Sequence, residues 1–87
     1  MYVLSRFGSR IVKSLRSPRH RALCAVLVGA RKKLKLSQHD LAKKLKTSQT
    51  VVARIEIGER RVDVVEFLDI AAALKLDARA VVSELMR

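Results

Sequence analysis

Aromatic residues, cysteine, proline and glycine are all scarce in this 87-residue chain. It has no tryptophan, one tyrosine, two phenylalanines, one cysteine, one proline and three glycines. A single cysteine excludes an intramolecular disulfide and fits a reducing cytoplasm. With so few aromatics, one small core must be built from Leu, Val, Ile and Ala, as in a compact helical bundle. Cys24 is expected to be a small buried residue of the first helix of that bundle.

The sequence also lacks the segments that would indicate an enzyme, a metalloprotein or a membrane protein. No stretch approaches the roughly 18 apolar residues of a membrane span, and no glycine-rich phosphate-binding loop occurs. His20 and His39 stand far apart beside polar residues, so we expect both at the surface, and no Cys/His cluster has metal-ligand spacing. We therefore expect no catalytic site, no metal or other cofactor, and no membrane contact.

Acidic residues are absent from the first part of the chain. Residues 1–36 hold ten Lys or Arg and no Asp or Glu, residues 37–61 hold six basic and three acidic residues, and residues 62–87 hold three basic and five acidic residues. Nearly all of the net charge of +11 therefore lies toward the N-terminus. Such a lopsided positive charge creates a field that attracts a polyanion, and double-stranded DNA is the expected partner.

Helix start signals divide the rest of the chain into five short helices. Ser17 followed by Pro18 is a strong start, and that helix should run to about Leu34. The next four are expected at about 38–45, 49–56, 64–74 and 78–86, after the caps Ser37, Ser48, Asp63 and Asp77, with Asp63 and Glu66 forming a capping box. The sequence thus predicts an all-α five-helix bundle over residues 18–87, preceded by a basic N-terminal arm or extra helix, residues 1–17.

The second and third of these helices have opposite faces of different chemistry. Their inner faces hold Leu41, Ala42, Leu45, Val52 and Ile55. Their outer faces carry residue types that hydrogen-bond base edges and phosphates, namely Lys43, Lys44, Gln49, Thr50 and Arg54. Two short helices of this kind, joined by a turn, are typical of a helix-turn-helix DNA-binding motif, here about residues 38–57.

Three segments carry a family resemblance. They are Leu-Ser-Gln-x-x-Leu-Ala-x-x-Leu from Leu36, Thr-Ser-Gln-x-x-Val-x-x-Ile-Glu-x-Gly from Thr47, and Phe-Leu-x-Ile-Ala-x-Ala-Leu from Phe67. Together they resemble the Cro/lambda-repressor-like, or xenobiotic-response-element, domain over roughly residues 22–82. The resemblance implies a compact five-helix fold whose third helix enters the major groove. Where the family often has glycine after a helix, this chain has Lys35, Lys46 and Lys75, so each lysine is expected to adopt a left-handed conformation that costs roughly 1 kcal/mol.

The predicted base contacts lie in the first two turns of the 49–56 helix. Gln49 and Arg54 are the predicted base readers, because glutamine can pair bidentately with adenine and arginine with guanine. Thr50 and Ala53 complete this set. The resemblance implies that Gln38 holds a phosphate while supporting the recognition helix. Further candidate phosphate contacts are Ser37, Ser48, Lys43, Lys44, Lys46, Arg60 and Arg61. Glu56 is expected to be structural, because an acid facing DNA would repel it.

Residues 1–16 lie outside the resemblance. Leu4, Phe7, Ile11 and Leu15 recur at spacings of three, four and four, which predicts an amphipathic helix. Such a helix packs either on the domain or on a second subunit. The alternatives are a basic arm that follows the DNA, a disordered terminus and a transit peptide.

These observations favour a sequence-specific transcriptional regulator, a repressor that acts by occluding a promoter. We expect it in the cytoplasm, associated with the nucleoid. Because one such domain covers few base pairs, we expect a homodimer on a pseudo-palindromic operator, with recognition helices about 34 Å apart. The predicted dimer surface is the last helix, with Val82, Leu85 or Met86, and the N-terminal helix is the second choice. The alternative function is an antitoxin that binds a small toxin protein and regulates its own operon.

Overall fold

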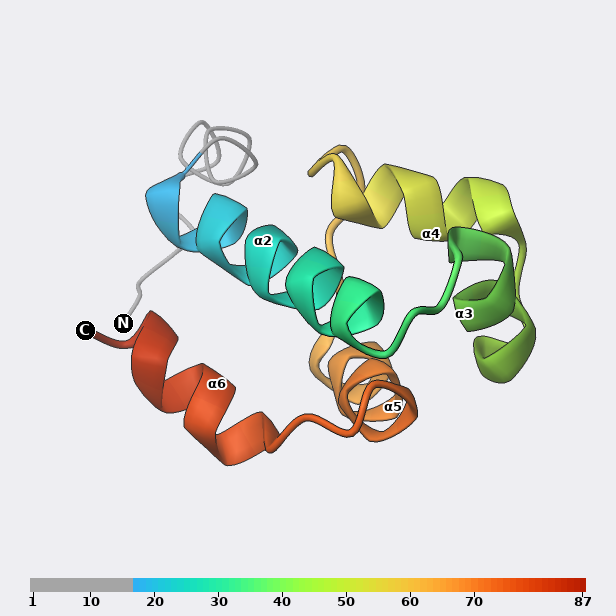
Figure 1. Cartoon of the computed structure of the whole chain (residues 1–87). Coiled ribbons are helices and arrows are strands. Elements are labelled where there is room, and N and C mark those ends of the chain that lie inside the picture. The colour runs from blue at the N-terminus through green and yellow to red at the C-terminus, as the bar shows by residue number, and fades with distance from the viewer. Residues whose placement is uncertain (1–16) are drawn as a thin grey trace.

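The fold of residues 17–87, as described by a computed structural model, is a bundle of five α-helices (Figure 1). In chain order the helices are α2 (Pro18–Lys33), α3 (Gln38–Leu45), α4 (Gln49–Glu56), α5 (Val64–Ala73) and α6 (Ala78–Leu85). These residues contain no strand. The all-α class is confirmed, and each helix ends within one residue of its predicted bound. The predictions for residues 1–16 lie outside the described residues.

Each described helix begins at the residue that the sequence marks as its cap. The Ser17, Ser37 and Ser48 hydroxyls accept from the backbone N–H three residues on, at 3.0, 2.9 and 3.2 Å. Asp63 caps α5 in the same way at 2.7 Å, and the Glu66 carboxylate accepts from the Asp63 N–H, which completes the predicted capping box. Ser37 forms a second box that the sequence analysis did not predict, with Asp40. These caps satisfy backbone N–H groups that a helix start leaves unpaired.

Three helices end in a left-handed lysine, as predicted. The φ angles of Lys35, Lys46 and Lys75 are 59°, 57° and 58°, and Gly58 after α4 has a φ of 85°. At Lys46 the turn is closed by the Thr47 N–H, which donates to the Ala42 carbonyl at 2.9 Å. The chain thus accepts the strain of a side chain in this conformation in order to turn sharply between α3 and α4.

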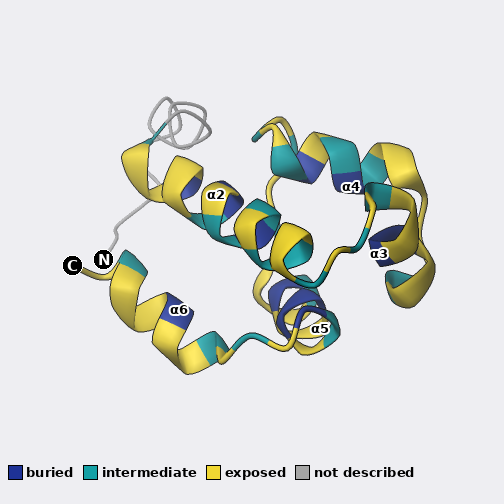
Figure 2. Cartoon of the chain, in the orientation of Figure 1, coloured by how far each residue is buried: buried dark blue, intermediate teal, exposed yellow. Residues whose placement is uncertain are grey.

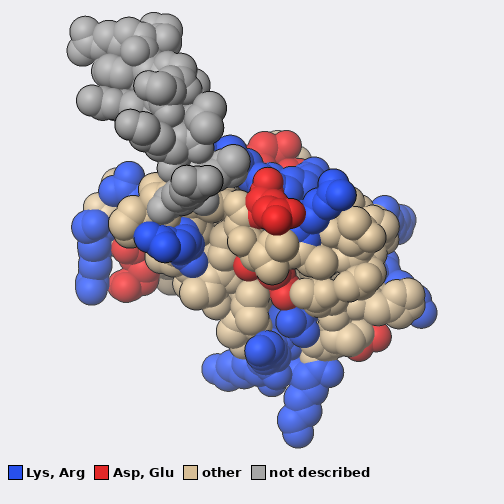
Figure 3. Space-filling view, turned by 90° about the horizontal axis from the view of Figure 1, so that it is seen from above, with Lys and Arg blue, Asp and Glu red and all other residues tan. Residues whose placement is uncertain are grey.

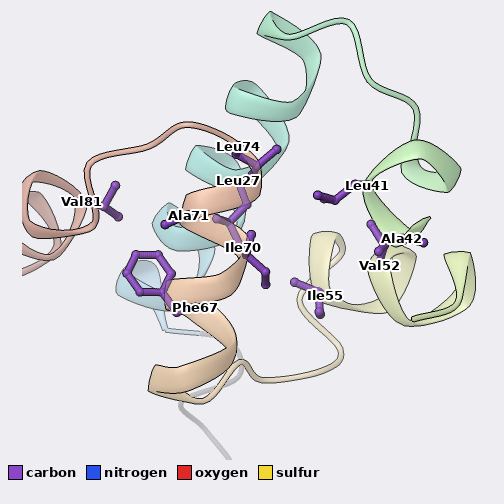
Figure 4. Close-up of a cluster of buried hydrophobic side chains, with 10 residues drawn as sticks. All are labelled: Leu27, Leu41, Ala42, Val52, Ile55, Phe67, Ile70, Ala71, Leu74 and Val81. Carbon is purple, nitrogen blue, oxygen red and sulfur yellow. The ribbon is translucent and has the colours of Figure 1, made fainter. Parts of the chain in front are cut away.

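The core is arranged around α5, which lies in the middle of the buried cluster (Figure 4). From α5 come Phe67, Ile70 and Ala71, with Leu74 at its C-cap. Side chains of α3 and α4 pack on one side of this helix, and Val81 of α6 packs on the other. The helix α2 contacts both α4 and α6. Exposed residues cover the outer faces of all five helices (Figure 2). The helices α3 and α4 lie at one end of the bundle, where their outer faces are exposed.

The first turns of α2 are tied to the end of α4 by a buried histidine and a buried cysteine. His20 is only 9% exposed, and its Nε2 lies 3.3 Å from the Gly58 carbonyl oxygen. The prediction that His20 lies at the surface was therefore wrong. The Cys24 thiol is buried as predicted and donates to the Ile55 carbonyl at 3.3 Å. Burial raises the pKa of this thiol, which agrees with a packing role for Cys24.

Candidate nucleic-acid interface

The outer face of α4 carries the residues that the sequence predicts as base readers. Gln49, Thr50 and Arg54 are exposed on this helix, and Ala53 is partly buried between them. Gln49 and Thr50 are its first two residues, and Arg54 lies one turn further along. The N-terminal half of a recognition helix is the part that contacts base edges in the major groove.

A chain of four side chains runs from this face into the protein. Gln49 Nε2 donates to Gln38 Oε1 at 2.7 Å, and Gln38 Nε2 donates to Glu56 Oε1 at 2.9 Å. Glu56 in turn accepts from the Arg31 guanidinium, with Nε 2.6 Å from Oε2 and Nη2 3.0 Å from Oε1. The chain connects α4, α3 and α2, so we call these four residues the reading relay. It brings together the two glutamines predicted separately as a base contact and a phosphate contact.

The inner end of the reading relay is a buried ion pair. The side chains of Arg31 and Glu56 are 11% and 6% exposed. Arg31 also donates through Nη1 to the Leu36 carbonyl at 2.7 Å, at the end of the α2–α3 connection. A buried charge is tolerated only when it is paired and hydrogen-bonded, and both conditions hold here. The expectation that Glu56 is structural therefore agrees with its position, and Arg31 is the partner that sequence reasoning missed.

The buried carboxylate determines which way the two amides point. A carboxylate only accepts hydrogen bonds, so Gln38 must turn its NH₂ toward Glu56 and its oxygen toward Gln49. Gln49 must then donate one of its N–H groups to that oxygen. Gln49 is exposed, and this bond uses only one of its two N–H groups and leaves its oxygen for another partner. A free N–H beside a free carbonyl is the pair of groups that matches N7 and the N6 amino group of adenine.

The predicted phosphate contacts near the outer face of α4 include two capping serines and three lysines. Ser37 and Ser48 are exposed N-caps whose oxygens already accept from the backbone, which leaves each hydroxyl hydrogen able to donate. Lys43, Lys44 and Lys46 are all exposed at the end of α3. One face of the molecule shows Lys and Arg side chains projecting from its edges, with some Asp, Glu and further basic side chains among uncharged residues in its middle (Figure 3). Whether these residues contact DNA stays a prediction.

Arg60 and Arg61 follow α4 and differ in their surroundings. The Arg60 guanidinium pairs with Glu66 at 2.7 and 3.2 Å, and both side chains are over one-third exposed. This pairing lowers the pKa of Glu66 and raises that of Arg60. Arg60 can reach a phosphate only by sharing or leaving this partner, while Arg61 is exposed. Their assignment as phosphate contacts also stays a prediction.

Two other kinds of site are absent from residues 17–87. No three or more Cys, His, Asp or Glu side chains in this range come together in a way that could hold a metal ion. None of its helices is both long enough and apolar enough to cross a membrane.

Comparison with known proteins agrees with this geometry. A family model described as "Helix-turn-helix" matches residues 29–81, more than half of the chain. A solved structure named "XRE-family like protein", from Pseudomonas syringae pv. tomato str. DC3000, superposes with a TM-score of 0.77 at 34% sequence identity. That match covers 87% of this chain and 93% of the other. No curated protein matched the chain.

Proposed function

We propose that this chain represses transcription by binding as a homodimer to a pseudo-palindromic operator. The chain belongs to the XRE-like helix-turn-helix family and is a DNA-binding transcriptional regulator. Repression would follow from occupancy of the promoter by the bound dimer. The two recognition helices would enter major grooves about 34 Å apart on one side of the DNA.

The observation that best supports a specific reading function is the orientation of Gln49. Its amide is held through Gln38 by a buried carboxylate, so its exposed groups are fixed before DNA arrives. Preorganisation lowers the entropy lost on binding, which favours a specific contact over a general one. We infer that Gln49 reads an adenine. Arg54, one turn along the same face, would read a guanine, and Thr50 and Ala53 would contact the bases between them.

Backbone contacts would come from the start of α3 and from its lysines. Gln38 has one N–H left after donating to Glu56, and it lies at the N-terminus of α3, where backbone N–H groups favour an anion. The further phosphate contacts in the proposal are Ser37, Ser48, Lys43, Lys44, Lys46, Arg60 and Arg61. Such contacts position the domain on the duplex and carry no sequence information themselves.

The dimer surface of the proposal lies on α6. Val82 and Met86 are 44% and 74% exposed, whereas Leu85 is partly buried against the core and its carbonyl accepts from Arg19 Nε at 2.7 Å. The proposed dimer surface on α6 therefore consists of Val82 and Met86, without Leu85. Replacing Val82 with Asp should weaken the dimer, whereas Val65→Asp, at an exposed valine of α5, is the matched control. Sedimentation with and without operator DNA measures the fraction of dimer for each of these two variants.

The test of base reading is selection of binding sites from randomised DNA. Gln49→Ala should cost about 1–3 kcal/mol on the selected site and relax the preference at one A·T pair per half-site. His39→Ala is the control, because His39 is exposed on α3 outside the proposed set. Site preferences that are identical for the parent and Gln49→Ala would contradict the proposal.

The antitoxin alternative makes a different prediction. A small toxin protein would co-purify with this chain in stoichiometric amount, and it would be absent if the chain is a repressor alone.

A further inference from the structure

A hollow of about 890 Å³ lies between α2 and the end of α4. Five residues of α2 and three at the end of α4 line it, namely Arg21, Cys24, Ala25, Val28, Gly29, Glu56, Ile57 and Gly58. None of them belongs to the predicted base or phosphate contacts. Hollows that bind small organic molecules typically measure about 300–1,000 Å³. This hollow therefore has the size of a small-molecule site and lies apart from the proposed DNA contacts.

Most of the side chains that line this hollow are apolar, and several of them are open to solvent. Ala25 and Gly29 are exposed, and Ile57 is 66% exposed although it is a large aliphatic residue. Val28 is half-buried, and the buried Cys24 joins the two helices through its bond to the Ile55 carbonyl. Exposed apolar surface with polar residues at its rim is typical of a binding site. The hollow therefore fits an apolar occupant.

Gly29 keeps one end of the hollow flat. Glycine inside a helix is destabilising relative to alanine, and one use of it is to let a ligand approach the backbone closely. A Cβ atom added at Gly29 would meet nothing within 4 Å, so crowding by the described residues does not explain the glycine. With the single methyl group of Ala25, it leaves a low surface of backbone and small side chains. A flat ring can lie in contact with such a surface.

The charges around the hollow favour an anionic group. Arg21 is an exposed lining residue and forms no ion pair within residues 17–87. Lys32 falls on the same face of α2, about three turns further on. The acidic residue that lines the hollow, Glu56, is already paired with Arg31. A guanidinium that has no carboxylate partner can bind a carboxylate ligand through two parallel N–H···O bonds.

We propose that this hollow binds a small aromatic carboxylate, with its rings on Ala25 and Gly29 and its carboxylate on the Arg21 guanidinium. Ala25 and Gly29 follow Arg21 by about 6 and 12 Å along the helix axis. An acid with two fused rings covers this span and contacts Val28 and Ile57 at its edges. Because Ile57 is the C-cap of α4, the occupant also touches the end of the recognition helix. The proposal concerns the free protein and rests on neither the operator nor the dimer.

Titration of the full chain with 2-naphthoate, without DNA, tests the proposal through NMR signals of the backbone amides. A ligand of this size should bind with a Kd of about 1 mM or tighter. The amide signals of Ala25, Val28, Gly29 and Gly58 should shift most. The uncharged 2-naphthamide should bind at least about threefold more weakly, and acetate, which has no ring, should leave these signals unchanged. No shift of these signals with 2-naphthoate, or equal affinity for 2-naphthamide, would overturn the proposal.

Two substitutions with matched controls locate the occupant. Gly29→Leu fills the ring position without crowding a described residue, so the protein should stay folded while the affinity for 2-naphthoate falls at least about tenfold. Ala22→Leu, at an exposed residue of α2 that does not line the hollow, should leave the affinity unchanged. Arg21→Gln should weaken 2-naphthoate about threefold or more but not 2-naphthamide, whereas Arg79→Gln, on α6, should affect neither. Affinity for 2-naphthoate that survives Gly29→Leu, or that falls equally in Arg21→Gln and Arg79→Gln, would contradict the proposal.

Discussion

Glu56→Gln is the substitution that most directly tests the reading relay. The change keeps the shape of the side chain but removes its charge. Three donors reach the two Glu56 oxygens, two from Arg31 and one from Gln38. A glutamine at position 56 has one acceptor oxygen and an NH₂ group, so at least one of these donors must face another donor. Arg31, 11% exposed, also keeps a buried positive charge without its counter-ion.

The expected loss of stability is large for a domain of this size. Breaking a buried ion pair by removing one partner costs about 3–5 kcal/mol, against a total stability of about 5–15 kcal/mol for small domains. At roughly 4–8 °C per kcal/mol, the Tm should fall by at least about 12 °C. Glu66→Gln is the matched control, because Glu66 forms an arginine pair whose two side chains are both over one-third exposed. That pair should contribute no more than about 1 kcal/mol.

Two further measurements separate charge burial from a general loss of packing. Replacing both partners, Arg31→Met with Glu56→Leu, should restore most of the lost stability, because no unpaired charge is then buried. This double variant should still fail to orient Gln38, so its site preference at the adenine should be as relaxed as that of Gln49→Ala. Thermal unfolding and randomised-site selection measure the two effects. A Tm for Glu56→Gln equal to that of Glu66→Gln would refute the argument.

Two other predictions concern the turns and the caps. Lys46→Gly should raise the Tm slightly, because it relieves roughly 1 kcal/mol of left-handed backbone strain. The greater entropy that glycine gives the unfolded chain offsets part of this gain. Lys44→Gly removes the same charge but lies inside α3, so it should lower the Tm. Hydrogen bonds hold the pKa of Asp40 and of Glu66 below their usual 3.8 and 4.5, mainly from Ser37 to Asp40 and from Arg60 to Glu66. Since these pKa values are lower in the folded state, the stabilisation is complete above about pH 5 and is lost as the pH falls through the folded pKa values. Unfolding followed by circular dichroism between pH 6 and pH 2 should show this loss of stability, and the loss should be smaller in Asp40→Asn. For the turn, a Tm of Lys46→Gly below that of Lys44→Gly would contradict the assignment of Lys46 as left-handed.

Local chemistry explains why the helices could be predicted so closely. A cap such as Ser17 or Asp63 acts on a backbone N–H only three residues away, so the sequence contains both partners. The left-handed turns at Lys35, Lys46 and Lys75 could be predicted because the family that the sequence resembles often has glycine at these positions, just after a helix. These features depend little on tertiary packing.

The surface prediction for His20 was wrong and the role of Arg31 was not predicted, because both roles depend on partners far away in the sequence. Both lie on the inner stripe of α2, since Arg31 follows Leu27 by four residues and His20 precedes Cys24 by four. That phase indicates burial, although histidine and arginine are residue types seldom found fully buried. The partners that make burial possible, Glu56 and the Gly58 carbonyl, lie 25 and 38 residues away in the sequence. Sequence spacing alone does not reveal such pairs.

The position of Glu56 resolves an apparent conflict in a protein built to approach DNA. A carboxylate near the outer face of α4 would repel phosphates. The part of the chain before Ser37 contains no acidic residue at all. The proposed reading of adenine by Gln49 needs the oxygen and nitrogen of that side chain in a defined order, and a group with fixed acceptor character can impose such an order through another amide. Glu56 does so while 6% exposed and paired with Arg31, so its charge is neutralised within the protein. The acid thus sets the hydrogen-bonding polarity of the surface without adding negative charge to it.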